Sequence, residues 1–232
     1  MAGCQQSGQE IVFTGELTDS PSKQIYLSEV TPEGTLLLDS CLPEKGKFCF
    51  VLREKQKELR ERRQTPHFYR LSFSEENGFT TVAKNGEILN IKADGMNLVT
   101  TYTISGSEEA QLMWQLDRQL SRFIDSTEVL QTIYENEIEN DSIRSRINEV
   151  YLILADNHTQ YLLNFIASHP NSITTIPAFY QRYNRKIFFP EEENLALLQQ
   201  IYQNLVILYP NNENVQYLKK RIESIEFKLK TP

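Results

Sequence analysis

Three cysteines are the side chains in this sequence best suited to chemistry, and Cys4 is the first of them. It directly follows Met1-Ala2-Gly3, and a cysteine after small residues is the pattern of a bacterial lipoprotein processing site. The thiol there forms a thioether to lipid, and several acyl chains bind a membrane stably where one binds only marginally. No charged segment and apolar segment of a signal peptide stand before Cys4 in this sequence, so two alternatives stay open: a lipid on Cys4 after removal of a signal peptide, or an accidental match.

The other two cysteines, Cys41 and Cys49, lie on either side of a turn at residues 43–46. Side chains alternate along a strand, which places Phe48 and Phe50 on one face and Cys49 on the other. Cross-strand cysteines can come close enough for a disulfide, so two alternatives stay open: two free thiols, or one structural disulfide. The spacing is not Cys-x-x-Cys and supports neither a redox centre nor a zinc site.

No other group of residues has the spacing of an active site. His67, His158 and His169 are far apart, and the chain has no nucleophile elbow, phosphate-binding loop or dinucleotide fingerprint. We therefore expect no catalytic residue, no metal and no cofactor. A remote alternative is a hydrolase that uses Asp94 or Asp125, although no spacing couples either carboxylate to a nucleophile.

Aromatic residues offer the best candidates for a binding surface. Tyr180, Tyr183 and Phe188 lie close together in the sequence, between apolar helical segments. Exposed together, they would form one wall of a concave face for a peptide, whereas burial of all three would count against this interpretation. Trp114 sits where the helical segments begin; it favours packing between domains, with a role in a binding surface as the alternative.

The overall composition excludes two further classes of protein. The chain has 232 residues with 24 Lys+Arg and 31 Asp+Glu, so its net charge of −7 argues against binding to nucleic acid. Hydrophobic residues make up 40%, which is enough for a packed core. No run approaches the ~18 apolar residues that a membrane-spanning helix requires.

The distribution of glycine divides the chain into two parts. All nine glycines lie in the first 106 residues, and glycine suits turns but destabilises helices. Before residue 106, eight short β-type runs alternate with turn residues; they lie near residues 11–14, 24–27, 36–38, 48–51, 68–71, 79–82, 88–91 and 98–104. After it, apolar residues recur at helical spacing. We predict an α+β protein, with a tether at 1–8, an antiparallel β-sandwich or open barrel at 9–106, and an all-α domain at 107–232.

The order of several short motifs resembles a known family. The motifs are Phe-Thr-Gly at 13–15, Ile-Tyr-Leu at 25–27, the Phe-x-Phe strand at 48–50, Tyr-Arg-Leu at 69–71, Ile-Lys-Ala-Asp at 91–94 and the Gly-Ser at 106–107. Together with the helical segments around Pro170 and Pro210, they resemble the domain of unknown function and helical linker that precede thioredoxin-like (AhpC/TSA-type) domains in envelope lipoproteins. The resemblance covers nearly the whole chain.

This resemblance implies a periplasm-facing protein of the cell envelope, held to the membrane by a lipid on Cys4. In the family, a Cys-x-x-Cys in the C-terminal thioredoxin-like domain carries the redox activity; this chain has no such motif and stops at Pro232, about where that domain would begin. We therefore expect a non-catalytic accessory region that serves a thioredoxin-like domain or a substrate protein. The alternative is a stand-alone lipoprotein that binds peptides or proteins with its helical hairpins.

Overall fold

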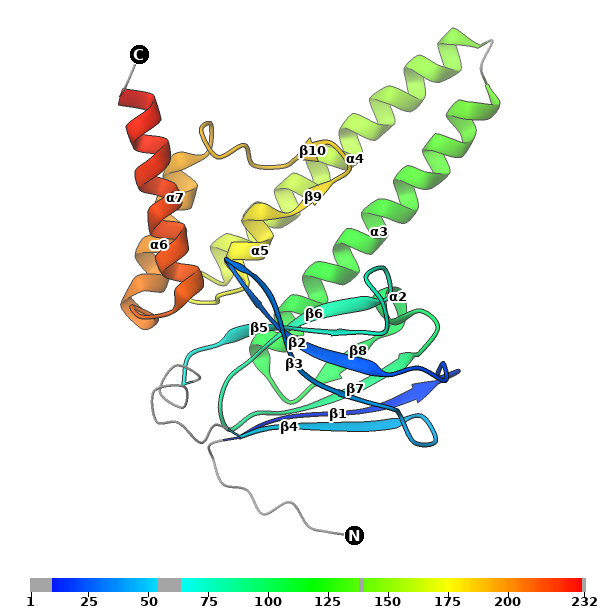
Figure 1. Cartoon of the computed structure of the whole chain (residues 1–232). Coiled ribbons are helices and arrows are strands. Elements are labelled where there is room, and N and C mark those ends of the chain that lie inside the picture. Colours follow the sequence, from blue (N-terminus) through cyan, green and yellow to red (C-terminus); the bar gives the residue numbers. More distant parts are fainter. Residues whose placement is uncertain (1–9, 54–63, 138–139, 231–232) are drawn as a thin grey trace.

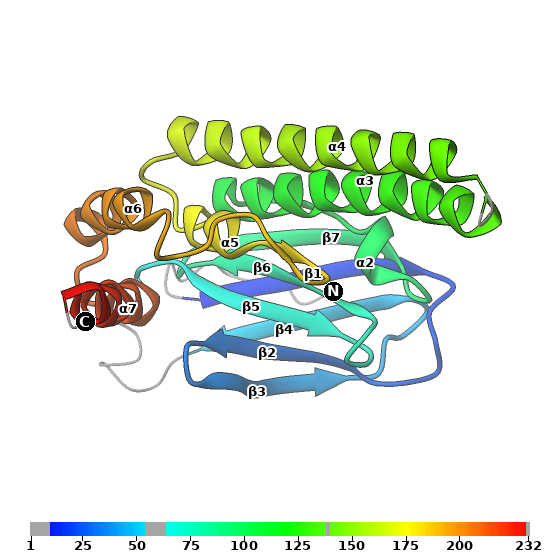
Figure 2. The same cartoon turned by 90° about the horizontal axis from the view of Figure 1, so that it is seen from above.

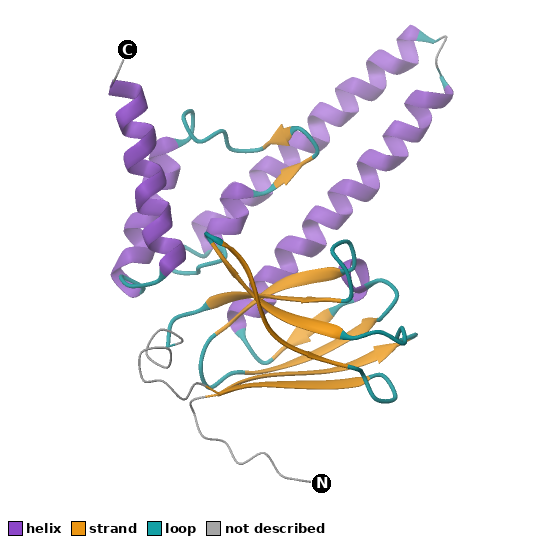
Figure 3. Ribbon diagram, in the orientation of Figure 1, coloured by secondary structure: helices purple, strands orange, loops and turns teal. Residues whose placement is uncertain are grey.

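The computed structural model describes residues 10–53, 64–137 and 140–230 and is an α+β protein. Strands come first in the chain and helices follow, as the colours of Figure 1 and Figure 3 show. The predicted fold class is therefore confirmed. Among the described helices, none is both long and apolar enough to cross a membrane.

Eight strands form two four-stranded sheets with the orders β4-β1-β7-β8 and β3-β2-β5-β6. Strand β1 pairs with β4 in antiparallel and with β7 in parallel orientation, and the other described pairs are antiparallel. The sheets stay separate, so the described strands form a sandwich and not a closed barrel. The strands are β1 (Glu10–Thr18), β2 (Ile25–Thr31), β3 (Gly34–Cys41), β4 (Lys47–Arg53), β5 (His67–Ser72), β6 (Gly78–Ala83), β7 (Ile88–Asp94) and β8 (Thr103–Ser105).

The core of the sandwich follows from the alternation of side chains along its strands. In β1, Ile11 and Phe13 are fully buried, whereas their neighbours Val12 and Thr14 are partly exposed. The ring of Phe13 meets that of Tyr69, from the opposite sheet, edge to face with centroids 5.2 Å apart. Gly15 lies beneath the ring of Phe48, where a Cβ atom would come within 2.3 Å of the ring. A residue with a Cβ atom at position 15 would therefore clash with the ring of Phe48.

The eighth predicted strand, residues 98–104, is partly wrong. Residues Leu98–Thr101 form a single helical turn, α2, and β8 begins only at Thr103. The side chain of Asn97 accepts a hydrogen bond from the backbone N–H of Thr100, which caps the turn. This local cap outweighs the β propensity of the Val-Thr-Thr run.

The change from strands to helices falls where the glycines predict it. Gly106 has a φ of 103°, and a Cβ atom there would lie 1.8 Å from the carbonyl oxygen of Ile88. Ser107 then caps α3 by accepting a hydrogen bond from the N–H of Ala110. The helices that follow are α3 (Glu108–Asn136), α4 (Asp141–Ser168), α5 (Thr175–Tyr180), α6 (Leu195–Leu208) and α7 (Glu213–Lys230).

One element of the second half is not helical, contrary to the all-α prediction. A short hairpin of β9 (Arg182–Tyr183) and β10 (Lys186–Ile187) lies between α5 and α6. Its strands have only two residues each, so the period-two pattern is too short to stand out in the sequence. In Figure 1 the hairpin runs beside α4.

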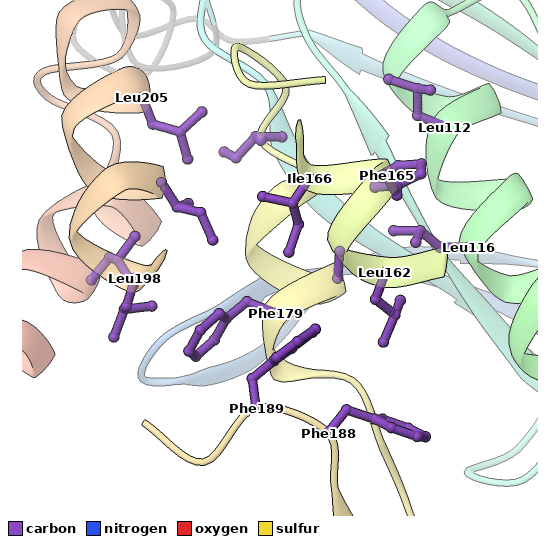
Figure 4. Packing of buried hydrophobic residues seen from close by; sticks show 14 of the residues in the cluster. Leu112, Leu116, Leu162, Phe165, Ile166, Phe179, Phe188, Phe189, Leu198 and Leu205 are labelled. Atoms are coloured by element: carbon purple, nitrogen blue, oxygen red, sulfur yellow. The ribbon is translucent and has the colours of Figure 1, made fainter. Parts of the chain in front are cut away.

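The helices and the sandwich share one packed core. Phe68 and Val82 point away from the sandwich interior and join the hydrophobic cluster of the helices. That cluster is built from α3, α4, α5, α6 and α7. Figure 4 shows part of it, with labelled side chains from α3 to α6 and the rings of Phe188 and Phe189 from the segment after β10. Seen from above in Figure 2, α3 and α4 lie over one side of the sandwich, while α6 and α7 lie at one end. The helices thus cover a sheet face as well as packing on each other.

Candidate functional site

The helices α3 and α4 form a long hairpin that extends away from the rest of the molecule (Figure 1). Near the sandwich, this hairpin buries large side chains such as Leu116 and Phe165. Farther out, Ile147 is only 9% exposed, but six other large apolar side chains are between 37% and 60% exposed: Val129, Ile133, Ile143, Val150, Leu152 and Ile153. We call this outer part, residues 124–137 and 141–154, the arm.

A groove of about 460 Å³ lies between the arm and the β9–β10 hairpin. The arm contributes Leu130, Tyr134, Ile147 and Tyr151 to its walls, together with the polar Thr127, Gln131 and Asn148; the hairpin contributes residues 183–186. Among the described residues that line it, the charged ones are Arg185 and Lys186, both basic. We call this the arm groove. Its apolar walls and basic rim suit an apolar side chain next to a carboxylate.

Local contacts fix both walls of the arm groove. Asn184 has a φ of 50° at the tip of the β9–β10 hairpin, a conformation that asparagine adopts more readily than most residues. On the arm, the guanidinium of Arg144 lies 4.3 Å from the ring centroid of Tyr134 and donates a hydrogen bond of 2.5 Å to its hydroxyl. These contacts hold a tyrosine and the hairpin tip in place at the groove.

An aromatic cluster centred on His158 ties the β9–β10 hairpin to α3 and α4. The imidazole lies 4.8 Å from the ring of Phe123 and 4.7 Å from that of Phe188. Its Nε2 makes a 2.6 Å hydrogen bond with the amide oxygen of Gln181, just before the hairpin. Burial lowers the pKa of His158, and this hydrogen bond opposes the effect. The neutral imidazole is therefore the form that fits this cluster.

The aromatic residues predicted as a binding surface do not form one exposed patch. Phe188 is only 6% exposed and belongs to the helical core, so this part of the prediction needs correction. Tyr183 is partly buried against Phe123, yet it also lines the arm groove. Tyr180 is exposed, and its hydroxyl donates a 2.8 Å hydrogen bond to Glu191. Burial, followed by contact with Glu191, raises the pKa of Tyr180.

Trp114 packs against the sandwich core and not in the arm groove. Its indole N–H donates a 2.8 Å hydrogen bond to the carbonyl oxygen of Tyr102. The Tyr102 hydroxyl in turn donates a 2.5 Å hydrogen bond to Asp117, and its ring stacks on Phe79. Burial raises the pKa of Asp117 to about 6, against the opposing effects of Tyr102 and Arg118. Trp114 thus helps to join α3 to the sandwich, which is the first of its two predicted roles.

No disulfide joins Cys41 and Cys49 in this structure. Cys41 ends β3 and Cys49 lies in β4, and these strands belong to different sheets. The thiol of Cys41 makes a hydrogen bond with the backbone of Cys49, while burial raises its pKa. Of the two alternatives, the structure therefore has the one without a disulfide between Cys41 and Cys49. Cys4, the predicted lipid attachment site, lies outside the described residues.

The carboxylates of the hydrolase alternative occupy different parts of the fold. Asp94 ends β7, where its Oδ1 accepts a 2.8 Å hydrogen bond from the N–H of Met96 in a turn. Asp125 is exposed on α3. Asp94 thus has a role in local structure, and the two residues are not brought together.

Within the part of the chain that the structure describes, one group of potential metal ligands comes together that no sequence motif indicates. Glu29 in β2, His67 in β5 and Glu213 in α7 each offer one ligand atom, and these atoms lie within 4.8 Å of one another. The Nδ1 atom of His67 is 3.2 Å from Oε1 of Glu29 and 3.7 Å from Oε1 of Glu213. The side chains of Glu29 and His67 are each 1% exposed, and that of Glu213 is 31% exposed. Residues so far apart in the chain carry no spacing signal.

Comparison with protein-family models, curated proteins and solved structures found no match to this chain. The fold and the site together define an α+β protein in which a two-sheet sandwich carries a helical part with a projecting arm. The resemblance to the N-terminal region of thioredoxin-like envelope lipoproteins remains a prediction.

Proposed function

We propose that this chain is a non-catalytic recognition region of an envelope lipoprotein, similar to the part that precedes a thioredoxin-like thiol–disulfide oxidoreductase domain. In this proposal, Cys4 anchors the protein to the membrane through lipid. The arm groove binds a segment of a protein partner and places it near the redox domain. The observation that carries the proposal is the arm groove itself, with apolar walls and two basic side chains at its rim.

The chemistry of the arm groove indicates which segment it would bind. Leu130, Ile147 and Tyr151 can pack around one or two apolar side chains, as the central contacts of interfaces do. Arg185 and Lys186 favour a neighbouring carboxylate. The occupant we propose is therefore an acidic protein segment with an apolar or aromatic residue at its centre.

Fluorescence anisotropy with labelled peptides tests this assignment. The probe is a twelve-residue peptide with a central Leu-x-x-Phe flanked by glutamates, and the comparison peptide has lysines in place of the glutamates. We expect the acidic peptide to bind, the basic peptide to bind far more weakly, and the affinity to fall as salt screens the charges. Equal binding of both peptides, or no binding of either, would contradict the proposal.

One matched pair of double variants and one single variant locate the binding. The double variant Arg185→Glu/Lys186→Glu should lower the affinity for the acidic peptide on the order of tenfold or more, because it reverses the charge of the rim. The control Lys219→Glu/Lys220→Glu makes the same charge change on exposed residues of α7, outside the residues that line the groove. Tyr151→Ala should also weaken binding. Equal losses in both double variants would mean that net charge, and not the groove, governs the affinity.

The lipid anchor has its own test, independent of the groove. Metabolic labelling with radioactive palmitate of cells that make the native protein should label the chain, and Cys4→Ser should prevent the labelling. A wild-type protein that stays unlabelled would refute the lipoprotein assignment without affecting the groove.

A second candidate is a stand-alone peptide- or protein-binding lipoprotein that uses its helical hairpins. The position of the groove favours it, because the arm projects from the molecule and carries a wall of the groove without help from another domain (Figure 1). The two candidates differ in one readout. Only the first candidate expects the bound segment to belong to a substrate protein or to a thioredoxin-like domain. For a substrate protein, it expects the thioredoxin-like domain to reduce the substrate's disulfide faster when this chain is present.

A further inference from the structure

We infer that Glu29, His67 and Glu213 bind a divalent transition-metal ion of the Zn²⁺ type, which fastens α7 to the end of the sandwich. The three residues come from β2, β5 and the first position of α7. This site lies outside the arm groove, and the inference is independent of the proposed function.

The geometry of the three side chains matches that of zinc ligands. Imidazole nitrogen and carboxylate oxygen bind Zn²⁺ at about 2.0–2.2 Å, so two ligands of a tetrahedral ion stand about 3.3 Å apart. The distances from Nδ1 of His67 to the two glutamate oxygens are 3.2 and 3.7 Å. All three ligand atoms lie within 4.8 Å of one another, so rotation of the glutamate side chains would bring them to zinc-binding distances around one ion.

The donor set also favours a divalent transition-metal ion. One imidazole nitrogen and two carboxylate oxygens are ligand atoms that Zn²⁺ takes in proteins. Glu29 and His67 are almost fully buried, and Glu213 lies at the N-terminus of α7.

A second layer of contacts orients the imidazole. Its Nε2 lies 3.5 Å from the hydroxyl of Thr65, so a proton on Nε2 can point there while Nδ1 faces the carboxylates. The amide of Asn212 donates a 3.2 Å hydrogen bond to the same hydroxyl and a 2.9 Å hydrogen bond to the carbonyl oxygen of Pro66. Metal-binding histidines usually have such a partner on the other ring nitrogen.

The same asparagine places the third ligand. The side-chain oxygen of Asn212 accepts hydrogen bonds from the N–H groups of Asn214 and Val215 and so caps α7. One residue therefore fixes both the start of α7, where Glu213 lies, and the segment before β5, where His67 lies. The partly exposed side of Glu213 leaves a path for the ion and a position for a water molecule as fourth ligand.

Calorimetric titration with Zn²⁺ tests the inference on chain that has been treated with a chelator and dialysed. All variants carry Cys4→Ser, Cys41→Ser and Cys49→Ser, so that thiols cannot bind the ion. We expect one Zn²⁺ per chain, a higher melting temperature with the ion, and visible absorption of tetrahedral type with Co²⁺. The absence of saturable binding with one ion per chain would refute the site and leave a buried group of charges only.

Two substitutions on α7 form a matched pair. Glu213→Gln removes a partly exposed ligand without disturbing the core and should weaken Zn²⁺ binding more than 100-fold, beyond the ~10–100-fold typical of outer contacts. The control Glu223→Gln changes a 60% exposed glutamate on the same helix and should leave the affinity unchanged. Thr65 positions the imidazole of His67, so Thr65→Val should lower the affinity for Zn²⁺ roughly 10–100-fold. Equal affinity in wild type and Glu213→Gln would overturn the inference.

Discussion

The two halves of the α3–α4 hairpin differ in what they pack against. Near the sandwich, Leu162 and Phe165 are at most 5% exposed and lie in a core that also includes residues of β5 and β6. In the arm, Leu152 and Ile153 are each 59% exposed. The same two helices thus provide a buried base next to the sandwich, which includes residues 155–168 of α4, and a projecting surface, the arm. An apolar stripe that continues past the end of the core is free to bind another molecule.

The base and the arm should therefore respond very differently to the loss of an apolar side chain. Leu162→Ala creates a cavity in the shared core and should lower the free energy of unfolding by about 2–5 kcal/mol. Leu152→Ala, ten residues earlier on the same helix, should change it by less than about 0.5 kcal/mol. Urea denaturation followed by circular dichroism measures both values. Similar losses in the two variants would mean that the arm is part of the core.

The contact between α3 and the sandwich should depend on pH through Asp117. Burial raises its pKa from 3.8 to about 6, so the folded state holds the proton more tightly than the unfolded state. Its favourable contribution is therefore present at low pH and is lost as the pH rises through about 6. Asp117→Asn keeps an acceptor for the Tyr102 hydroxyl but cannot ionise.

We expect Asp117→Asn to be more stable than wild type at pH 7.5 by about 1–3 kcal/mol. The difference should shrink as the pH falls below 6. Urea denaturation between pH 4.5 and pH 8 gives the comparison, and Asp125→Asn, an exposed residue on the same helix, serves as the control. A difference that does not vary with pH would contradict the assignment to Asp117.

The attachment of the β9–β10 hairpin should show a smaller pH dependence of the opposite sign. Burial lowers the pKa of His158 below its usual 6.5, so the folded state disfavours the protonated imidazole. The stabilising contribution of the neutral His158 is therefore fully present above pH 6.5 and is lost as the pH falls below that value. His158→Gln can keep a hydrogen bond to Gln181 and should not show this loss. Tyrosine fluorescence during urea denaturation at pH 5.5 and pH 7.5 is the measurement; equal pH dependence of both proteins would exclude His158.

The sequence predicts most of the fold because its signals are local. All nine glycines lie in the first 106 residues, and the periodicity of apolar residues on either side of this point predicts the strands and the long helices. The short α2 turn and the β9–β10 hairpin were missed because each depends on one cap or turn residue, Asn97 or Asn184. Periodicity cannot reveal elements of two to four residues.

The candidate sites were less predictable, because each depends on contacts between distant residues. Tyr183 lines the arm groove as an aromatic binding residue should, whereas Phe188, five residues later, is buried by α3 and α4. A sequence shows aromatic residues but not which helix covers them. For the arm, the sequence carries one usable signal, the apolar stripe along α4 with Ile143, Ile147 and Val150. Ile147 is buried, whereas Ile143 and Val150 are 37% and 38% exposed. The sequence carries no signal for the group formed by Glu29, His67 and Glu213.

Hydrogen exchange followed by mass spectrometry, with and without the acidic Leu-x-x-Phe peptide, tests the division of the molecule most directly. Without peptide, amides of the arm should exchange faster than those of α4 between residues 155 and 168, because fewer buried contacts hold them. With peptide, exchange should slow in the arm and at residues 182–187 and stay unchanged in the sandwich. Slowing that falls on the sandwich, or an arm as protected as the base before peptide is added, would contradict the account.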